Sequence, residues 1–349
     1  MAGVNPAMVT LAREARSMTQ TALAEAAGVS QGFISKVENG VVELTPEALE
    51  PISDALGFPS TLFMQADRIA GTACLHHRKR QSMPILRLRA IHAQINLTRM
   101  QTTRLLNGVE IDPPFEFPRM DVDLYDSVEE IAQLARAHWQ VPLGPLNSLI
   151  GTIEAAGGIV IRTSFDTDKL DAISQWTPGE HPFFFVNESI PGDRLRWTLA
   201  HELGHIIMHG VPSPQQEAEA DRFAAEFLMP AREIRPELAN LAMPKLTTLK
   251  QRWKVSMAAL IRRATDLGQI SARQQRSFFM RFSQLGYRKN EPFSIPQEQP
   301  SLVKKVLEIH RSEHGYSISE MSQAALLFED EFRDRFLADE AQVRLRLVT

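Results

Sequence analysis

Residues 195–208 read LRWTLAHELGHIIM, and this stretch decides what the fold around it must provide. His201 and His205 are four residues apart, so on a helix they lie on one face, one turn from each other. Both imidazoles can then reach one metal ion, and Glu202 is placed to hold and deprotonate a water at that metal. Leucines recur every four residues, at Leu195, Leu199 and Leu203, and on a helix they lie on the side opposite to the histidines. The stretch therefore predicts an amphipathic helix with a zinc peptidase site on its cleft side.

A catalytic zinc site needs a third protein ligand and an open position for water. His209 continues the four-residue spacing, but it lies about 12 Å along the helix axis from His201, too far to share one ion with it. We expect His209 to cap the helix or to contact a ligand histidine from behind. The better candidate is Glu217, which begins the segment EAEADRFAA, a predicted second helix.

Glu217 and Asp221 are four residues apart, so they share a helical face. Glu217 can complete a His, His, Glu ligand set, while Asp221 can accept a hydrogen bond from the far nitrogen of a ligand histidine. Glu219 faces away from Glu217 and is the second choice for the third ligand. The alternative interpretation is a solvated acidic start of a helix, which the helix dipole favours.

Composition and charge narrow the class of protein. The chain has 349 residues, 44% hydrophobic and 23% charged, which are globular values. No apolar stretch is long enough for a signal peptide or a membrane span. The single cysteine, Cys74, suits a reducing compartment. We therefore expect a cytoplasmic protein with no membrane partner.

The net charge of the chain is −4, but the charges are unevenly distributed and one segment is strongly basic. From Arg68 to Leu106 the sequence has no acidic residue, and it carries eight lysines and arginines. This segment is either a solvated linker or helix face, or a region that contacts phosphates beside a DNA-binding domain. In the second hypothesis it binds single-stranded DNA, and binding exposes the peptidase cleft or aligns the substrate. The residues expected to make these contacts are Arg78, Lys79, Arg80, Arg87 and Arg89.

The N-terminal residues 6–64 predict a series of short helices. These are expected at Ala7–Arg16, at Gln20–Ala27 after the cap Thr19, at Gln31–Glu38 after the cap Ser30, and from Pro46 to Leu56. Two short helices joined by the turn Ala27–Ser30 are typical of a helix-turn-helix, whose second helix enters the major groove of DNA. The alternative is a helical bundle that binds protein.

The stretches LAE at 23–25, AGVS at 27–30 and ISKVENG at 34–40 resemble the repressor/Cro (XRE) helix-turn-helix family. The resemblance implies five DNA-facing positions, which here are Gln20, Gln31, Gly32, Ser35 and Lys36. Gln31 and Ser35 can hydrogen-bond base edges, whereas Lys36 is expected to meet phosphate.

The order of elements predicts a fold that is mainly α with a small β-sheet, of the α+β class. Helices are expected at Val128–Trp139 and Leu146–Ala156, strands at 159–161, 171–174 and 183–187, and the last strand is expected at a sheet edge where a substrate could add. We expect a helix-turn-helix domain at 1–68, a connector at 69–120, a zincin-like peptidase domain at 121–275 and a helical C-terminal region at 276–349. Residues 246–269 have the rhythm of a second helix-turn-helix, or else pack inside the domain.

Five stretches together resemble the ImmA/IrrE family of metallopeptidases, which is found beside or fused to XRE regulators. They are RWTLAHELGH at 196–205, the stretch Glu217–Pro230 that ends in FLMP, and LKQRWKVS at 249–256, with ALI at 259–261 and RKNEP at 288–292. The resemblance implies that Glu217 is the third ligand, Glu202 the catalytic base, and Zn²⁺ (or Mn²⁺) the metal, in a gluzincin-like endopeptidase.

The resemblance also implies a function and partners. The expected substrate is a DNA-bound repressor or an antitoxin-like protein, cut in a stress, DNA-damage or phage response. The expected partners are operator duplex, single-stranded DNA, the protein substrate and a second copy of the chain. Two alternatives remain, a transcription factor whose metal site is structural or sensory, and an interaction protein that no longer cleaves. The intact Glu202 argues against both, because structural zinc sites have four closed protein ligands. His209 and Arg196 are the candidates for stabilising the oxyanion.

Overall fold

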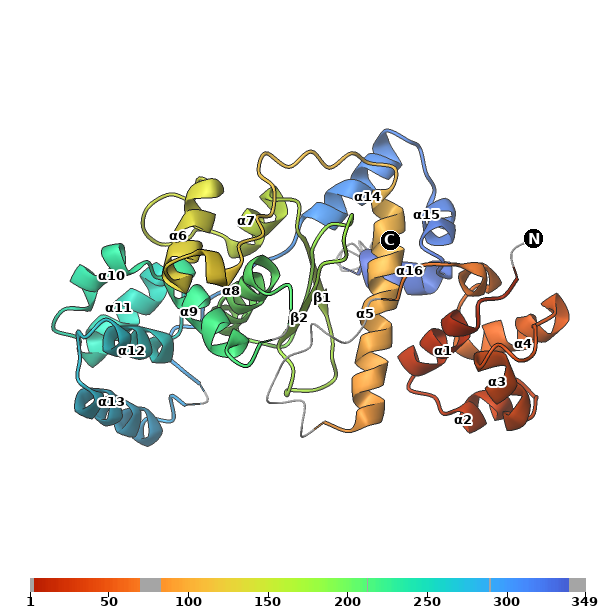
Figure 1. Cartoon of the computed structure of the whole chain (residues 1–349), viewed down its shortest axis with the longest axis horizontal. Coiled ribbons are helices and arrows are strands. Elements are labelled where there is room, and N and C mark those ends of the chain that lie inside the picture. Colours follow the sequence, from red (N-terminus) through yellow and green to blue (C-terminus); the bar gives the residue numbers. More distant parts are fainter. Residues whose placement is uncertain (1–2, 70–82, 212, 289, 339–349) are drawn as a thin grey trace, which may run out of the picture. The chain divides into compact units, whose positions relative to one another are not determined.

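The computed structural model describes residues 3–69, 83–211, 213–288 and 290–338. It divides into two compact units. The first unit holds the N-terminal residues to 69, the segment 83–111 and the C-terminal residues from Leu302, and the second holds Asp112–Ser301. Helices predominate in both units, and a small sheet lies in the second (Figure 1). The predicted class, mainly α with a small β-sheet, is confirmed.

The first unit begins with the predicted series of short helices. Its elements to residue 64 are α1 (Pro6–Ala15), α2 (Gln20–Ala26), α3 (Gln31–Glu38), α4 (Pro46–Leu56) and the 3₁₀ helix η1 (Ser60–Met64). The two expected caps are present: the Thr19 hydroxyl accepts from the Ala22 amide at 3.1 Å, and the Ser30 hydroxyl from the Phe33 amide at 3.2 Å. Gly28 between α2 and α3 has a φ of +67°, a conformation that suits glycine.

A long helix, α5 (Ile85–Leu106), completes the core of this unit. It packs on α1 and on two C-terminal helices, α14 (Leu302–Ser312) and α15 (Ile318–Ala324), which α16 (Glu329–Phe336) follows. Leu97 and Met100 of α5 are buried in one cluster with Leu307 of α14 and Phe332 of α16. Within 85–106, the linker interpretation of the basic segment is therefore wrong, because half of this helix faces a core. The expected C-terminal region, 276–349, contributes helices to both units.

The second unit contains the sheet and the helices expected to carry the site. Its elements are the 3₁₀ turn η4 (Val122–Leu124), the helices α6 (Val128–His138) and α7 (Leu149–Ala155), the strands β1 (Ile159–Thr163), β2 (Ala172–Gln175) and β3 (Phe183–Asn187), and the helices α8 (Gly192–Met208), α9 (Gln216–Leu228), α10 (Ala231–Leu238), α11 (Met243–Trp253), α12 (Met257–Asp266) and α13 (Ala272–Gln284).

The sheet has the order β1-β3-β2, with β1 parallel and β2 antiparallel to β3. The expectation that Phe183–Asn187 forms a sheet edge is wrong. All five of its residues are buried and the strand is paired on both sides, which matches its unbroken apolar run rather than an alternating pattern. Among the described strands, β2 is the edge that lies against α8.

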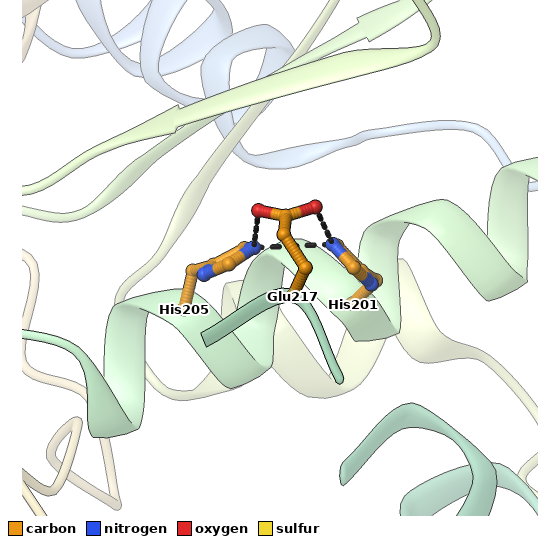
Figure 2. Close-up of side chains that lie close together, drawn as sticks. All are labelled: His201, His205 and Glu217. Carbon is orange, nitrogen blue, oxygen red and sulfur yellow. Dashed lines mark hydrogen bonds and ion pairs between the residues drawn. The ribbon is translucent and has the colours of Figure 1, made fainter. Parts of the chain in front are cut away.

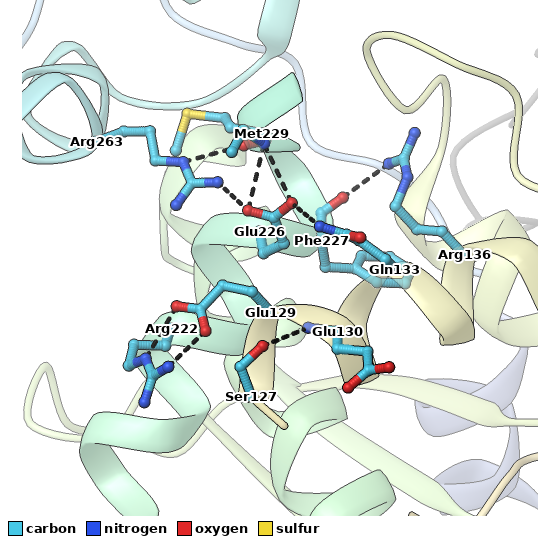
Figure 3. Close-up of polar contacts among 11 residues, drawn as sticks. Ser127, Glu129, Glu130, Gln133, Arg136, Arg222, Glu226, Phe227, Met229 and Arg263 are labelled. Atoms are coloured by element: carbon cyan, nitrogen blue, oxygen red, sulfur yellow. Dashed lines mark hydrogen bonds and ion pairs between the residues drawn. The ribbon is translucent and has the colours of Figure 1, made fainter. Parts of the chain in front are cut away.

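A buried polar network holds α9 in place (Figure 3). The Glu226 carboxylate of α9 is fully buried and accepts hydrogen bonds from Gln133 of α6, from Arg263 of α12 and from the Ala231 amide. Arg136 of α6 donates to the Phe227 carbonyl at 2.7 Å. Because removing one member would leave a buried charge without its partner, this network resists displacement of α9.

Candidate metal centre

Two helices bring together the three residues expected to bind a metal. α8 presents His201 and His205 from adjacent turns, and α9 directs the Glu217 carboxylate between them (Figure 2). Nε2 of His201 and Nε2 of His205 are 3.1 Å apart. The Glu217 carboxylate lies 3.7 Å from the first nitrogen and 3.4 Å from the second. These atoms form the one group of three metal-type donors found among the described residues.

The donor chemistry and spacing fit a zinc-type ion. Zinc is bound at about 2.1 Å by imidazole nitrogen and carboxylate oxygen, and two ligands of a tetrahedral site are then about 3.4 Å apart. The two Nε2 atoms are 3.1 Å apart, and each lies near a different oxygen of Glu217, His205 at 3.4 Å from Oε1 and His201 at 3.7 Å from Oε2, so these separations are close to that value. Three donors also leave the fourth position that a hydrolytic site requires.

The far nitrogen of each histidine is also engaged. Nδ1 of His201 lies 2.9 Å from Oδ1 of Asp221, the residue expected there. Nδ1 of His205 lies 2.9 Å from Nδ1 of His209, and Nε2 of His209 lies 3.0 Å from Glu219. Glu219, the second candidate for the third ligand, therefore contacts His209 and is not part of the group of three donors.

These contacts select one set of tautomers. A histidine that binds metal through Nε2 is neutral and carries its proton on Nδ1. His205 then donates to Nδ1 of His209, which must carry its own proton on Nε2 and donate it to Glu219. The Asp221–His201 and Glu219–His209–His205 chains both orient the rings with Nε2 toward Glu217. His209 is also the C-cap residue of α8, so it lies at the end of the helix and beside His205.

Without a metal, the pKa of His201 lies above the ordinary value for histidine. Burial opposes its charge, but hydrogen bonds to Asp221 and Glu217 and the charge of Glu202 outweigh burial and raise the pKa of His201 to about 9. The clustered carboxylates thus favour a positive charge at the position where the metal would lie.

Gly204 sets the distance between the two helices. A Cβ at this position would lie 3.2 Å from Phe223 of α9, tighter than an ordinary contact. The absence of a side chain lets α9 approach α8 closely enough for Glu217 to reach the histidines. Gly204 lies within the histidine motif, but its role depends on a helix that is distant in sequence.

Glu202, the expected base, is buried, and its Oε2 accepts a hydrogen bond of 2.6 Å from the Ser174 hydroxyl. Ser174 lies on β2, 28 residues earlier in the chain. Sequence reasoning missed this residue, because a serine within a short strand carries no local signal of a contact with α8.

The two candidates for stabilising an oxyanion, Arg196 and His209, are both engaged in other contacts. Arg196 is 1% exposed, forms an ion pair with Glu298 and donates to the Leu146 carbonyl. His209 bridges His205 and Glu219. Neither side chain is therefore available for the oxyanion role in this arrangement.

The five expected DNA-facing residues lie on α2 and α3. Gln31, Gly32 and Lys36 are exposed, whereas Gln20 and Ser35 are half-buried. Gln31 donates to Gln20 at 2.8 Å, and Gln20 donates to Glu38 at 2.7 Å. Glu38 in turn pairs with Arg13 of α1. This chain of contacts fixes the Gln31 amide at the start of α3.

Most of the described arginines in the basic segment contact other residues of the protein. Arg104 pairs with Asp67 at 2.7 Å, and the buried Arg99 donates to the Arg68 carbonyl. Arg89 is 3.9 Å from Glu14 with its side chain 58% exposed, and Arg87 also has an interaction partner. Arg78, Lys79 and Arg80 lie outside the described residues, so their contacts with nucleic acid stay a prediction.

The second helix-turn-helix rhythm, at 246–269, corresponds to α11 and α12 joined by Lys254, Val255 and Ser256. The Glu291 carboxylate accepts from the Met257 and Ala258 amides at the start of α12 and pairs with Lys250 of α11. The Glu291 carboxylate therefore covers the helix end that would approach DNA, which favours the packing interpretation. Burial opposes the charge of Lys250, but Asp193 and Glu291 outweigh it and raise its pKa.

Comparison with known families follows the division of the chain. The Peptidase_M78 model, described as the IrrE N-terminal-like domain, matches residues 154–265, which include α8 and α9. A helix-turn-helix model matches residues 10–63. No curated protein matches the chain. No described helix has both the length and the apolar character needed to cross a membrane. The two matched segments, an XRE-type helix-turn-helix at 10–63 and an IrrE-like (ImmA/IrrE) peptidase domain at 154–265, correspond to the two parts of the fusion that the sequence resembles.

Proposed function

We propose that this protein is a zinc-dependent endopeptidase that acts in the cytoplasm. Its helix-turn-helix domain brings it to DNA, where it cuts a transcriptional repressor or an antitoxin-like protein in response to stress, DNA damage or phage. The observation that carries the catalytic part is the group of three donors on α8 and α9, with Glu202 beside it.

His201, His205 and Glu217 would hold the metal, which when bound polarises the scissile carbonyl and acidifies water. Glu202 is the general base. Ser174 engages Oε2, so we expect Oε1 to take the proton from the attacking water. The oxygen of this water then bonds to the carbonyl carbon of the substrate. The C–N bond breaks, and Glu202 returns the proton to the leaving amine nitrogen.

The strand β2 is the proposed docking site for the substrate. It lies at the sheet edge, and Ser174 of this strand contacts the base directly. An extended substrate that added beside β2 would run past Glu202, with backbone hydrogen bonds fixing its register. The same sheet arrangement argues against docking at β3, which is paired on both sides.

A transcription factor with a structural or sensory metal site is the second candidate function. It predicts that the metal is needed for folding or for DNA affinity, and that no peptide bond is cut. The three-donor arrangement favours catalysis, because a structural zinc site closes with a fourth protein ligand.

The test uses the purified full chain loaded with zinc and a repressor encoded beside its gene, with and without single-stranded DNA. Mass spectrometry of the products should detect one or a few defined cuts. The variant Glu202→Gln should keep its zinc, measured by elemental analysis, and lose about 10²–10⁴ of its rate because the base is gone. Cleavage by this variant at the parent rate would contradict the mechanism. Loss of folding on zinc removal, with no cleavage under any condition, would favour the second candidate.

A further inference from the structure

The helix α13 (Ala272–Gln284) presents an arginine-rich face. Arg273, Arg276 and Arg281 are all exposed, and among the described residues no carboxylate pairs with them. The surrounding sequence, 267–290, contains no acidic residue. Arg194, Arg222 and Arg252, which are also exposed in this unit, are each paired with a carboxylate. Arg232, Arg262 and Arg288 are exposed without such a pair among the described residues, but they lie on separate segments, whereas α13 carries three unpaired arginines on one helix.

Helical geometry places these three arginines together. Arg273, Met280 and Gln284 lie on one face, with Arg276 and Arg281 on either side of it. The arginines span about 12 Å along the axis at about 1.5 Å per residue. On the opposite face, Phe282 is buried, so α13 is anchored by its aromatic side and turns its charge outward. The helix packs on α12 in the second unit (Figure 1).

We propose that this face of α13 is a second nucleic-acid site, which binds the phosphodiester backbone without reading sequence. Arginine is suited to phosphate because its planar group offers paired donors. Exposed glutamine and serine side chains of the same helix, such as Ser277 and Gln284, add the uncharged donors that phosphate contacts commonly use.

The composition of the face favours nucleic acid over an acidic protein. Protein interfaces concentrate aromatic or aliphatic anchors in a centre depleted of charge. Here the phenylalanines turn inward, and Met280 is the one large apolar side chain between the arginines, 62% exposed. Nucleic-acid interfaces are instead polar and strongly positive. The helix-turn-helix domain on the same chain would also raise the local concentration of DNA at α13.

The test measures how the affinity of the full chain for DNA depends on salt. Parent and variants all carry Gln31→Ala and Lys36→Ala, so that any contribution of the first domain is weakened equally. The test variant is Arg273→Gln, Arg276→Gln, Arg281→Gln. The matched control is Arg194→Gln, Arg222→Gln, Arg252→Gln, which removes the same charge from the same unit. Fluorescence anisotropy with a random-sequence duplex and with a single strand, between 50 and 200 mM salt, gives the slopes.

Loss of three phosphate contacts should reduce the slope of log affinity against log salt by about 2.7 for duplex and about 2.1 for a single strand. Between these salt concentrations, the parent should therefore lose about 40-fold more duplex affinity than the test variant, or about 20-fold more for a single strand. The control should behave as the parent. Equal slopes in the two triple variants would overturn the proposal. The proposal would also be overturned if the test variant lost binding to a labelled polyglutamate peptide while its DNA binding stayed unchanged. That result would indicate an acidic protein partner. Neither outcome bears on peptidase activity, so this site and the proposed function can fail separately.

Discussion

The hydroxyl of Ser174 lies 2.6 Å from Oε2 of Glu202, and this hydrogen bond joins the edge strand β2 to the centre of α8. Both side chains are buried, so the contact is shielded from water. It fixes the carboxylate on the helix that presents the two histidines. The same strand is the proposed docking edge, so substrate position and base position depend on one element.

Ser174→Ala should slow cleavage while leaving the zinc content unchanged. A hydrogen bond to a charged group contributes about 1.5–3 kcal/mol, and its loss lets the carboxylate rotate away from the attacking water. We expect a fall in kcat of about 10-fold or more, with little change in KM, because the strand's backbone remains. Rates and zinc stoichiometry measured on the same preparation check this. A parallel loss of zinc would mean that Ser174 supports the metal cluster rather than the base.

Glu217→Ala and Glu219→Ala should weaken zinc binding to different degrees. Glu217 lies 3.4 Å from Nε2 of His205, whereas Glu219 acts through His209. Removing an outer hydrogen-bonding partner typically costs about 10–100-fold in metal affinity, and loss of a ligand should cost more. Competition with a chromophoric chelator measures both constants. The reverse order of affinities would make Glu219 the ligand.

Gly204→Ala should reduce zinc affinity although the new methyl group touches no ligand. The added Cβ would press on Phe223 at 3.2 Å and push α9, with Glu217, away from the histidines. Ala132→Gly, a buried α6 substitution in the same core, serves as a control for general destabilisation. If both variants melt at lower temperature but only Gly204→Ala binds zinc more weakly, the helix-spacing role is supported. Equal zinc affinity in the two variants would contradict it.

Zinc affinity should rise with pH up to about 9. The metal must displace the proton of His201, whose pKa is raised to about 9, so affinity should increase about tenfold per pH unit below that value and then level off. Stability of the metal-free protein should show the opposite trend. The raised pKa stabilises the folded state fully below the ordinary value of 6.5, and this contribution is lost as pH rises toward 9. Asp221→Asn should lower the pKa of His201 and so move the plateau of zinc affinity to lower pH. Isothermal titration between pH 6 and 9.5 measures the position of the plateau. An unchanged position would contradict the role of Asp221.

The histidine motif, the caps and the class of fold could be predicted because they depend on residues close in sequence. His201 and His205 share a helical face by spacing alone, and Thr19 and Ser30 cap the helices that directly follow them. The pairing of Glu217 with the histidines was predictable as a ligand set, but the closeness of α8 and α9 depends on Gly204 meeting Phe223.

What could not be predicted depends on contacts between distant segments. The run Phe183–Asn187 is apolar, which does not distinguish an edge strand from a central one until its two partners are known. Arg99 and Arg104 have the composition of a nucleic-acid contact, yet both hold the segment after η1. Charge alone does not show whether a cation has a partner, and this is why the group of unpaired arginines on the single helix α13 could be recognised only in the structure.

Gln20→Ala should relax the discrimination of the helix-turn-helix domain among DNA sequences as Gln31→Ala does. Gln20 accepts from Gln31 at 2.8 Å and is itself held by Glu38, so it fixes the orientation of the Gln31 amide. Without that support the amide loses its fixed donor and acceptor positions toward a base edge. Lys36→Ala should instead weaken binding to all sequences and reduce the salt slope by about 0.9, as expected for one lost phosphate contact. Anisotropy titrations against a panel of operator variants separate the two effects. If Gln20→Ala and Gln31→Ala together relaxed discrimination by the sum of their separate effects, the two residues would act independently and the support role of Gln20 would be wrong.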